Sequence, residues 1–176
     1  MDIIERAQLI ATTAHAAINQ RRKYTDDPYI VHPQAVAELV MDFGGRDKMI
    51  AAAWLHDVAE DTAITVDWLC QQMGDDVAKL VDEVTDKSTP ADGNRRARKR
   101  IDLEALAKAS PEAQTIKLAD LIDNTRTIIA YDPGFARTHL REKQALLRVL
   151  TKGNYALYRE AYRSLHWSFD KLGMEA

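Results

Sequence analysis

The sequence predicts an all-α fold, a single bundle of about eight to nine helices, on two observations. The chain of 176 residues has 7 Gly, 5 Pro and 7% aromatic residues, and a fold rich in strands and tight turns needs more of each. Apolar residues also recur at steps of three and four along most of the chain, which is the spacing of one buried helical face. A length of 176 residues suits one domain.

The expected helices share this apolar spacing and are bounded by capping residues, Gly or Pro. They cover about residues 2–19, 33–43, 47–58, 65–74, 75–84, 95–109, 112–130, 135–151 and 154–172.

Local signals set the boundaries of these helices. In the first half, Pro33 begins the second helix, Gly44 ends it, and Thr65 is the expected N-cap of a short helix that ends at Gly74. Residues 86–94, with the sequence DKSTPADGN, are turn-forming and almost without core residues, so we expect a mobile surface loop that could gate a site.

The second half follows the same rules. The pair Ser110-Pro111 precedes the helix over residues 112–130 and resembles an N-cap followed by a first-turn proline. Pro133-Gly134 ends that helix, and Gly153 separates the last two.

Charge and cysteine content narrow the class of partner. The net charge of −3 shows that the chain has no surplus of Lys and Arg, which a nucleic-acid-binding protein needs to neutralise phosphates. The single Cys70 cannot form an internal disulfide, and Glu5 and Arg6 interrupt the first apolar stretch, which excludes a signal peptide or membrane span there. We therefore expect a cytoplasmic protein with no nucleic-acid or membrane partner, and its oligomeric state stays open.

An acidic residue ends the apolar stripe of the third helix. Ile50, Ala53, Trp54 and Asp57 occupy positions i, i+3, i+4 and i+7, so the Asp57 carboxylate should face the core. A buried carboxylate must be protonated, paired with a cation or bound to a metal. The neighbouring His56 supplies a nitrogen ligand, which favours the metal.

Two further side chains complete a candidate ligand set. Asp120 lies among Leu118 and Leu121 in a second core helix, and His32 lies at the entrance of the helix that Pro33 begins. Taken singly, His32 and Asp120 could equally be hydrogen-bonded polar groups of the core. Together with His56 and Asp57 they form a set of two imidazoles and two carboxylates, which suits one Mn²⁺ or Fe²⁺ ion and does not exclude Zn²⁺.

Such a site is suited to hydrolysis of phosphate esters, because the ion polarises a phosphoryl oxygen and activates a bound water. Glu60 and Asp61 follow the His56-Asp57 pair by four residues and could orient that water and handle protons, or form a solvated acidic turn. Of the basic cluster over residues 95–100, Arg95 is the preferred phosphate clamp, and most of the others suit a solvated face.

Three segments, YIVHP, AAAWLHDVAEDT and IKLADLIDNTRT, stand in the order found in the hydrolase domain of the RelA/SpoT family, within the HD-domain superfamily. The chain resembles that family over about residues 11–130, including RRK at 21–23, LVDEVTDK at 80–87 and RARKR at 96–100. The C-terminal helices, about residues 135–172, match only in helical character.

The resemblance implies one HD domain over residues 1–176 that acts alone, and Mn²⁺-dependent removal of the 3′-diphosphate from ppGpp and pppGpp, with release of pyrophosphate. By motif position it implies that the metal is held by His32, His56, Asp57 and Asp120, and that Glu60 and Asp61 act on the nucleophilic water. It places Arg22 and Lys23 beside the guanine and Asn124 at the nucleotide sugar.

The chain departs from the family pattern at three places. Leu121 and Asp123 stand where the family has Arg and His, and the family's Tyr in the next helix has no clear counterpart near residues 141–144. These departures bear on substrate choice, so hydrolysis of another nucleotide, such as a deoxynucleoside triphosphate or NADPH, is one alternative. A non-catalytic helical module that binds a nucleotide is the other. His15 is expected in the core, and His139 and His166 are expected to be structural or exposed.

Overall fold

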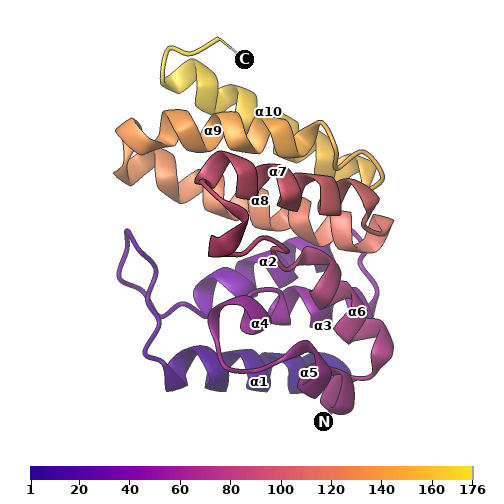
Figure 1. The fold of residues 1–176 in the computed structure, drawn as a ribbon. Helices are drawn as coiled ribbons and strands as arrows, with labels where there is room; N and C mark the ends of the chain where they lie inside the picture. Colours follow the sequence, from indigo (N-terminus) through magenta and orange to yellow (C-terminus); the bar gives the residue numbers. More distant parts are fainter. Residues whose placement is uncertain (176) are drawn as a thin grey trace. The chain divides into compact units, whose positions relative to one another are not determined.

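A computed structural model describes residues 1–175, apart from the side chains of residues 127, 130 and 133. Its regular elements are helices, and the described residues contain no strand beyond an isolated bridge between Arg21 and Pro28. The all-α prediction is confirmed. The chain divides into two compact units, residues 1–85 and the remainder from Asp86, which are described separately (Figure 1). The single domain over residues 1–176 stays a prediction.

The first unit contains helices α1 (Ile3–Ala17), α2 (Val31–Asp42), α3 (Asp47–Leu55), α4 (Val58–Asp61), α5 (Val66–Met73) and α6 (Asp75–Val84). Helix α3 packs against α1, α2 and α6. Ala51, Ala52 and Ala53 on α3 have no exposed surface, because helices lie against it on several sides. Their small side chains let the neighbouring helices approach closely.

The caps that the sequence predicts in this unit are present. The Thr65 hydroxyl accepts a hydrogen bond from the backbone N–H of Trp68 at 3.2 Å and begins α5. Gly74 follows α5 with a φ of +85°, a left-handed conformation that favours glycine. Gly44, with a φ of +81°, follows α2 in the same way.

Several boundaries differ from the prediction. Helix α2 begins at Val31, two residues before the expected Pro33, and the helix expected over residues 135–151 is α9 (Pro133–Leu147), which begins and ends earlier. The third helix differs most in its hydrogen bonding. The third helix was expected to continue to about residue 58, but α3 ends at Leu55, and His56 and Asp57 lie between it and the single turn α4. Both residues keep right-handed backbone angles, and hydrogen bonding resumes when Asp61 donates its N–H to the Asp57 carbonyl at 2.9 Å. The break therefore concerns the backbone hydrogen-bond pattern, which apolar spacing does not report.

The second unit contains a 3₁₀ turn, η1 (Pro90–Asp92), and helices α7 (Arg95–Lys108), α8 (Pro111–Tyr131), α9 (Pro133–Leu147) and α10 (Tyr155–Lys171). Helix α8 packs against α9 and α10, and α7 packs against α9. As predicted, Ser110 caps α8, accepting a hydrogen bond from the Ala113 N–H at 3.2 Å. Leu118, Leu140 and Leu165 are among the buried residues of this unit.

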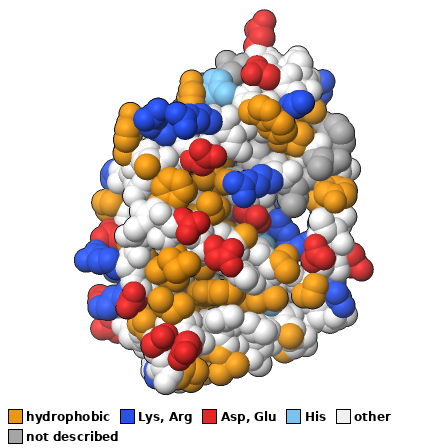
Figure 2. All heavy atoms as spheres, turned by 180° about the vertical axis from the view of Figure 1, so that it is seen from behind, with side chains coloured by type: hydrophobic (Ala, Val, Ile, Leu, Met, Phe, Trp, Pro, Cys, Tyr) orange, Lys and Arg blue, Asp and Glu red, His pale blue; other side chains and the backbone are white. Residues whose placement is uncertain are grey.

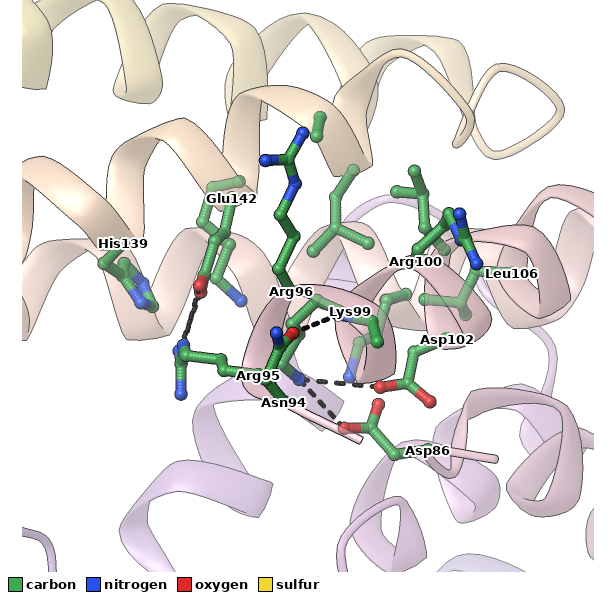
Figure 3. Close-up of a pocket in the computed structure, with 16 residues that line it drawn as sticks. Asp86, Asn94, Arg95, Arg96, Lys99, Arg100, Asp102, Leu106, His139 and Glu142 are labelled. Carbon is green, nitrogen blue, oxygen red and sulfur yellow. Dashed lines mark hydrogen bonds and ion pairs between the residues drawn. The ribbon is translucent and has the colours of Figure 1, made fainter. Parts of the chain in front are cut away.

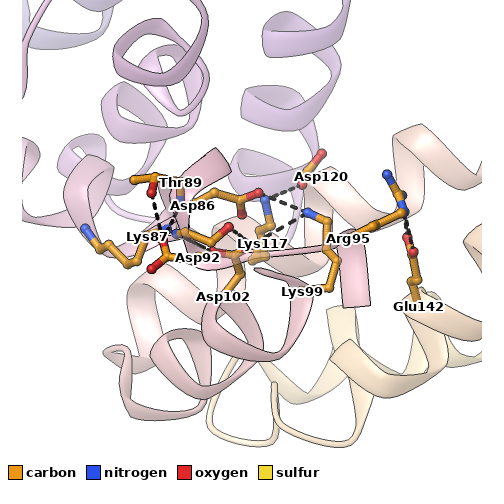
Figure 4. Close-up of polar contacts among 11 residues, drawn as sticks. Asp86, Lys87, Thr89, Asp92, Arg95, Lys99, Asp102, Lys117, Asp120 and Glu142 are labelled. Carbon is orange, nitrogen blue, oxygen red and sulfur yellow. Dashed lines mark hydrogen bonds and ion pairs between the residues drawn. The ribbon is translucent and has the colours of Figure 1, made fainter. Parts of the chain in front are cut away.

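The loop over residues 86–94 is fastened to α7 by Asp102, a buried carboxylate (Figure 4). Asp102 Oδ1 accepts the backbone N–H groups of Lys87 and Ser88 at 3.0 and 2.8 Å, and Oδ2 accepts the Ser88 hydroxyl at 3.0 Å. Thr89 and Asp92 form a capping box around η1. The expected surface loop is thus held by specific hydrogen bonds over its first residues.

Basic and acidic side chains are interspersed among apolar ones on the face shown in Figure 2. This distribution agrees with the small net charge of −3. None of the described helices is both long enough and apolar enough to cross a membrane.

Candidate metal centre

Three predicted ligands meet in the first unit. His32, His56 and Asp57 each offer a ligand atom, and these atoms lie within 4.8 Å of one another. Asp57 Oδ2 lies 3.0 Å from His56 Nε2 and 3.5 Å from His32 Nε2. His32 comes from the first turn of α2 and the other two from the break after α3, so the packing of α2 on α3 brings them together.

The His56 imidazole is oriented for a metal. Its Nδ1 lies 2.8 Å from the Ala53 carbonyl oxygen, which can only accept a hydrogen bond, so Nδ1 carries the proton. Nε2 then presents its lone pair, and this buried atom has no hydrogen-bond partner among the described residues. A backbone carbonyl that fixes the tautomer of a histidine ligand is common in metal sites. The donor set therefore fits a divalent cation.

Tyr29 positions the carboxylate of this cluster, and the sequence reasoning missed it. Its hydroxyl donates to Asp57 Oδ2 at 2.6 Å. The Tyr29 ring is near two imidazoles, with centroid distances of 4.8 Å to His15 and 5.8 Å to His32. The backbone N–H of His32 also donates to the backbone carbonyl of Tyr29 at 3.0 Å. The available signal was the position of Tyr29 three residues before His32 in YIVHP.

The predicted water-activating residues lie on α4. Glu60 and Asp61 are both exposed. Asp61 Oδ2 accepts a hydrogen bond from Gln20 Nε2 at 2.8 Å, and Gln20 Oε1 lies 2.7 Å from His15 Nδ1. His15 is buried, as expected of a core histidine, and through Gln20 it fixes the position of the Asp61 carboxylate.

The predicted guanine contacts lie in the segment between α1 and α2. The backbone N–H of Arg22 donates to the backbone carbonyl of Asp27 at 2.9 Å and closes a short turn. Lys23 Nζ donates to the Tyr24 hydroxyl at 3.2 Å and lies 4.8 Å from the Tyr24 ring centroid. The role of Arg22 and Lys23 in binding a base stays a prediction.

The remaining predicted site residues belong to the second unit (Figure 4). On α8, Asp120 is buried, its Oδ2 lies 3.0 Å from Lys117 Nζ, and its Oδ1 accepts a short hydrogen bond from Asn124 Nδ2. On α7, Arg95 pairs with Glu142 through two hydrogen bonds of 2.8 Å. The assignments of Asp120 to the metal, Asn124 to the sugar and Arg95 to phosphate stay predictions.

Comparison with known proteins decides the family. The HD domain family matches residues 7–150. The chain belongs to the HD-domain family. It is 32% identical to the human guanosine-3′,5′-bis(diphosphate) 3′-pyrophosphohydrolase MESH1 over 97% of both chains. This confirms the resemblance to RelA/SpoT-type HD hydrolases.

Two further matches agree with this assignment. The chain is 37% identical to a probable guanosine-3′,5′-bis(diphosphate) 3′-pyrophosphohydrolase of Synechocystis over 84% of its length, but spans only 20% of that relative. A solved structure of a metazoan orthologue of SpoT, described as hydrolysing ppGpp, superposes with a TM-score of 0.84 at 28% identity, covering 99% of this chain and 98% of that one. The chain thus spans about a fifth of the long bacterial relatives and nearly all of the human and mouse MESH1 proteins.

Proposed function

We propose that this HD-domain protein is a Mn²⁺-dependent hydrolase that removes the 3′-diphosphate of ppGpp and pppGpp, giving GDP or GTP and pyrophosphate. The observation that carries the proposal is the cluster of His32, His56 and Asp57, with the His56 lone pair free to bind a metal. The names of the similar proteins support the substrate, since several are guanosine-3′,5′-bis(diphosphate) 3′-pyrophosphohydrolases.

His32, His56 and Asp57 would hold the metal, with Asp120 as a fourth ligand. When bound, a divalent ion polarises a phosphoryl oxygen and makes water a stronger nucleophile at neutral pH. Mn²⁺ suits a mixed set of imidazole and carboxylate ligands, and Fe²⁺ and Zn²⁺ are the alternatives that a metal comparison must test. Tyr29 holds the Asp57 carboxylate by its 2.6 Å hydrogen bond, so that this ligand is oriented before the metal arrives.

Glu60 and Asp61 would orient the attacking water and accept its proton. Asp61 suits this role because the 2.8 Å hydrogen bond from Gln20 leaves its other carboxylate oxygen for a water. Its exposed position on α4 also gives the proton a path to solvent. Glu60 lies on the same turn, one residue closer to the metal pair in sequence.

Arg22 and Lys23 would contact the guanine, Asn124 the sugar and Arg95 a phosphate. The Arg95 guanidinium bonds Glu142 through Nε and Nη2, which leaves Nη1 to donate to a phosphate oxygen. We also propose that the two units act as one HD domain, since the family match over residues 7–150 includes parts of both. The free Cys70 suits a reducing cytoplasm.

The test is hydrolysis of a nucleotide panel by the purified chain with Mn²⁺, Fe²⁺, Zn²⁺, Mg²⁺ or EDTA. We expect pyrophosphate release from ppGpp and pppGpp, fastest with Mn²⁺ and absent with EDTA. Tripolyphosphate release from deoxynucleoside triphosphates, or phosphate release from NADPH, with ppGpp untouched, would overturn the alarmone assignment. Failure to bind any divalent metal would overturn the metal centre itself.

Two variants distinguish hydrolysis by this protein from hydrolysis by a contaminating enzyme. Asp57→Ala should abolish Mn²⁺ binding and turnover, and Glu60→Ala should lower kcat by roughly 10²–10⁴-fold while Mn²⁺ still binds. Glu38→Ala is the matched control, because Glu38 is an exposed carboxylate of the same unit that bonds Gln34 Nε2 at 2.8 Å. Unchanged hydrolysis in Asp57→Ala and Glu60→Ala would favour a non-catalytic nucleotide-binding module.

A further inference from the structure

The second unit contains a cavity of about 720 Å³ between α7, α8 and α9 (Figure 3). Six cationic side chains and three carboxylates line it, and the cations are Arg95, Arg96, Lys99, Arg100, Lys117 and Lys143. This volume suits a ligand of nucleotide size. The excess of cations over carboxylates suits an anionic ligand.

The carboxylates of the wall are already engaged by some of these cations. Lys99 Nζ lies 3.0 Å from Asp86 and 3.8 Å from Asp102, while Glu142 forms its two hydrogen bonds with Arg95. Figure 3 shows Lys99 of α7 pointing toward Asp86 and Asp102, and Arg95 of α7 pointing toward Glu142 of α9. None of these pairs includes Lys143.

Lys143 is a buried cation that lines the cavity from α9. It is 9% exposed, and within the described part of the chain it makes no hydrogen bond or ion pair. On α9 it stands three residues after Leu140 and four before Leu147, both buried, so it occupies the apolar stripe of an amphipathic helix. A core position of this kind normally carries an apolar side chain.

The surroundings disfavour the charged form of this side chain. Burial lowers the pKa of the Lys143 ammonium, and the nearby Lys117 and Lys99 lower it further, while attraction to Asp120 and Asp86 opposes them. An apolar residue of similar length would therefore be more stable here than lysine. A side chain kept at a cost in stability is typical of a site for a ligand.

We propose that Lys143 is a phosphate-binding residue, and that the cavity around it receives a phosphate or diphosphate group of the ligand. The inference deepens the proposed function, because a guanosine polyphosphate supplies such groups. The Lys143 ammonium has three N–H donors, and the anionic oxygens of a phosphate group can accept them and balance the excess of cations in the wall. Lys143 thereby distinguishes ligands by their phosphate content and not by their base.

The test measures binding of inorganic pyrophosphate to the full chain by calorimetry. Divalent metal is left out, so that no metal ion can bridge the protein and the pyrophosphate. Lys143→Met should weaken pyrophosphate binding about tenfold or more, because it removes a charge-assisted hydrogen bond. Lys143→Arg keeps a cation and should stay within a few-fold of the wild type. Lys108→Met, an exposed lysine near the end of α7 that does not line the cavity, is the matched control and should change nothing.

Thermal unfolding without ligand supplies a second readout that a purely structural lysine would not give. Lys143→Met should melt at or above the temperature of the wild type, since a buried thioether replaces a buried ammonium. Equal pyrophosphate affinity in Lys143→Met and wild type, or no binding to either, would overturn the inference. So would a lower melting temperature in Lys143→Met together with unchanged affinity.

Both readouts are independent of turnover. If the wild type binds pyrophosphate but hydrolyses no ppGpp, and Lys143→Met loses pyrophosphate binding, the proposed function fails and the phosphate site stands. If ppGpp is hydrolysed with the same KM by both proteins and pyrophosphate binds both equally, the phosphate site fails and the function stands. In an active enzyme, loss of the Lys143 contact should appear mainly as a higher KM.

Discussion

Replacing Tyr29 by Phe removes one hydroxyl from beside the metal cluster and leaves the ring in place. That hydroxyl donates to Asp57 Oδ2 at 2.6 Å, the length of a hydrogen bond to an ionised carboxylate. Such a bond contributes about 1.5–3 kcal/mol, which corresponds to roughly a 10- to 150-fold change in an equilibrium constant. Groups that orient metal ligands typically change metal affinity by about 10- to 100-fold. We therefore expect Tyr29→Phe to weaken Mn²⁺ binding by about 10- to 100-fold.

The assay is calorimetric titration of the metal-free chain with Mn²⁺, together with the rise in melting temperature that saturating Mn²⁺ produces. Tyr24→Phe is the matched control, because the Tyr24 hydroxyl bonds Lys23 Nζ in the same segment and has no part in the cluster. It should bind Mn²⁺ within about twofold of the wild type. An affinity of Tyr29→Phe equal to or higher than that of the wild type would refute the view that Tyr29 orients Asp57 for the metal.

Three further predictions concern the second unit. Asp102→Ala leaves the Ser88 N–H without its acceptor and should lower the free energy of unfolding by about 2–3 kcal/mol in a urea titration; a loss under 0.5 kcal/mol would mean that the 86–94 loop is not held there. Gly153→Ala places a Cβ 2.8 Å from a buried leucine methyl and should cost about 1–3 kcal/mol, whereas Gly134→Ala, whose nearest neighbour lies at 3.8 Å, should be nearly neutral. Burial lowers the pKa of His139 from 6.5 to about 4, so between these pH values the unfolded chain binds a proton that the folded chain does not. Stability should therefore fall as the pH drops through this window, by at most about 3 kcal/mol from this group. His139→Gln should lose that part of the slope, and an identical pH dependence in both proteins would contradict the assignment.

The helix boundaries were largely predictable because their signals are local. Thr65 caps α5 and Ser110 caps α8, as their positions before apolar runs indicate, and Gly74 takes the left-handed conformation that a helix end favours. Each of these devices acts within one helical turn of the residue concerned. The error at His56 and Asp57 arose where the backbone hydrogen bonds change but the apolar spacing continues, and smaller errors concern the start of α2 and both ends of α9.

The site was predictable in its ligand types and less so in its supporting groups. Asp57 attracts attention because a carboxylate stands in an apolar stripe, and the same reasoning applies to Asp120. Lys143 stands in such a stripe as well, but the adjacent Arg141 and Glu142 make that part of α9 read as a solvated face. The position of Tyr29 three residues before His32 was a weak signal, because a tyrosine before a helix has many ordinary uses.

By itself, the sequence determined that the chain is helical, where most of the helices begin and end, and that His56 and Asp57 are adjacent groups of ligand type. These properties depend on residues within a turn or two of one another. Only the tertiary structure decided that His32 approaches Asp57 to 3.5 Å, that Tyr29 bonds the same carboxylate, and that Ala53 fixes the His56 tautomer. Those contacts depend on how α2 and the segment before it pack against α3, and on the conformation of the turn after α3. The spacing of residues along the chain does not specify side-chain positions to a fraction of an ångström, because close packing of the core determines them.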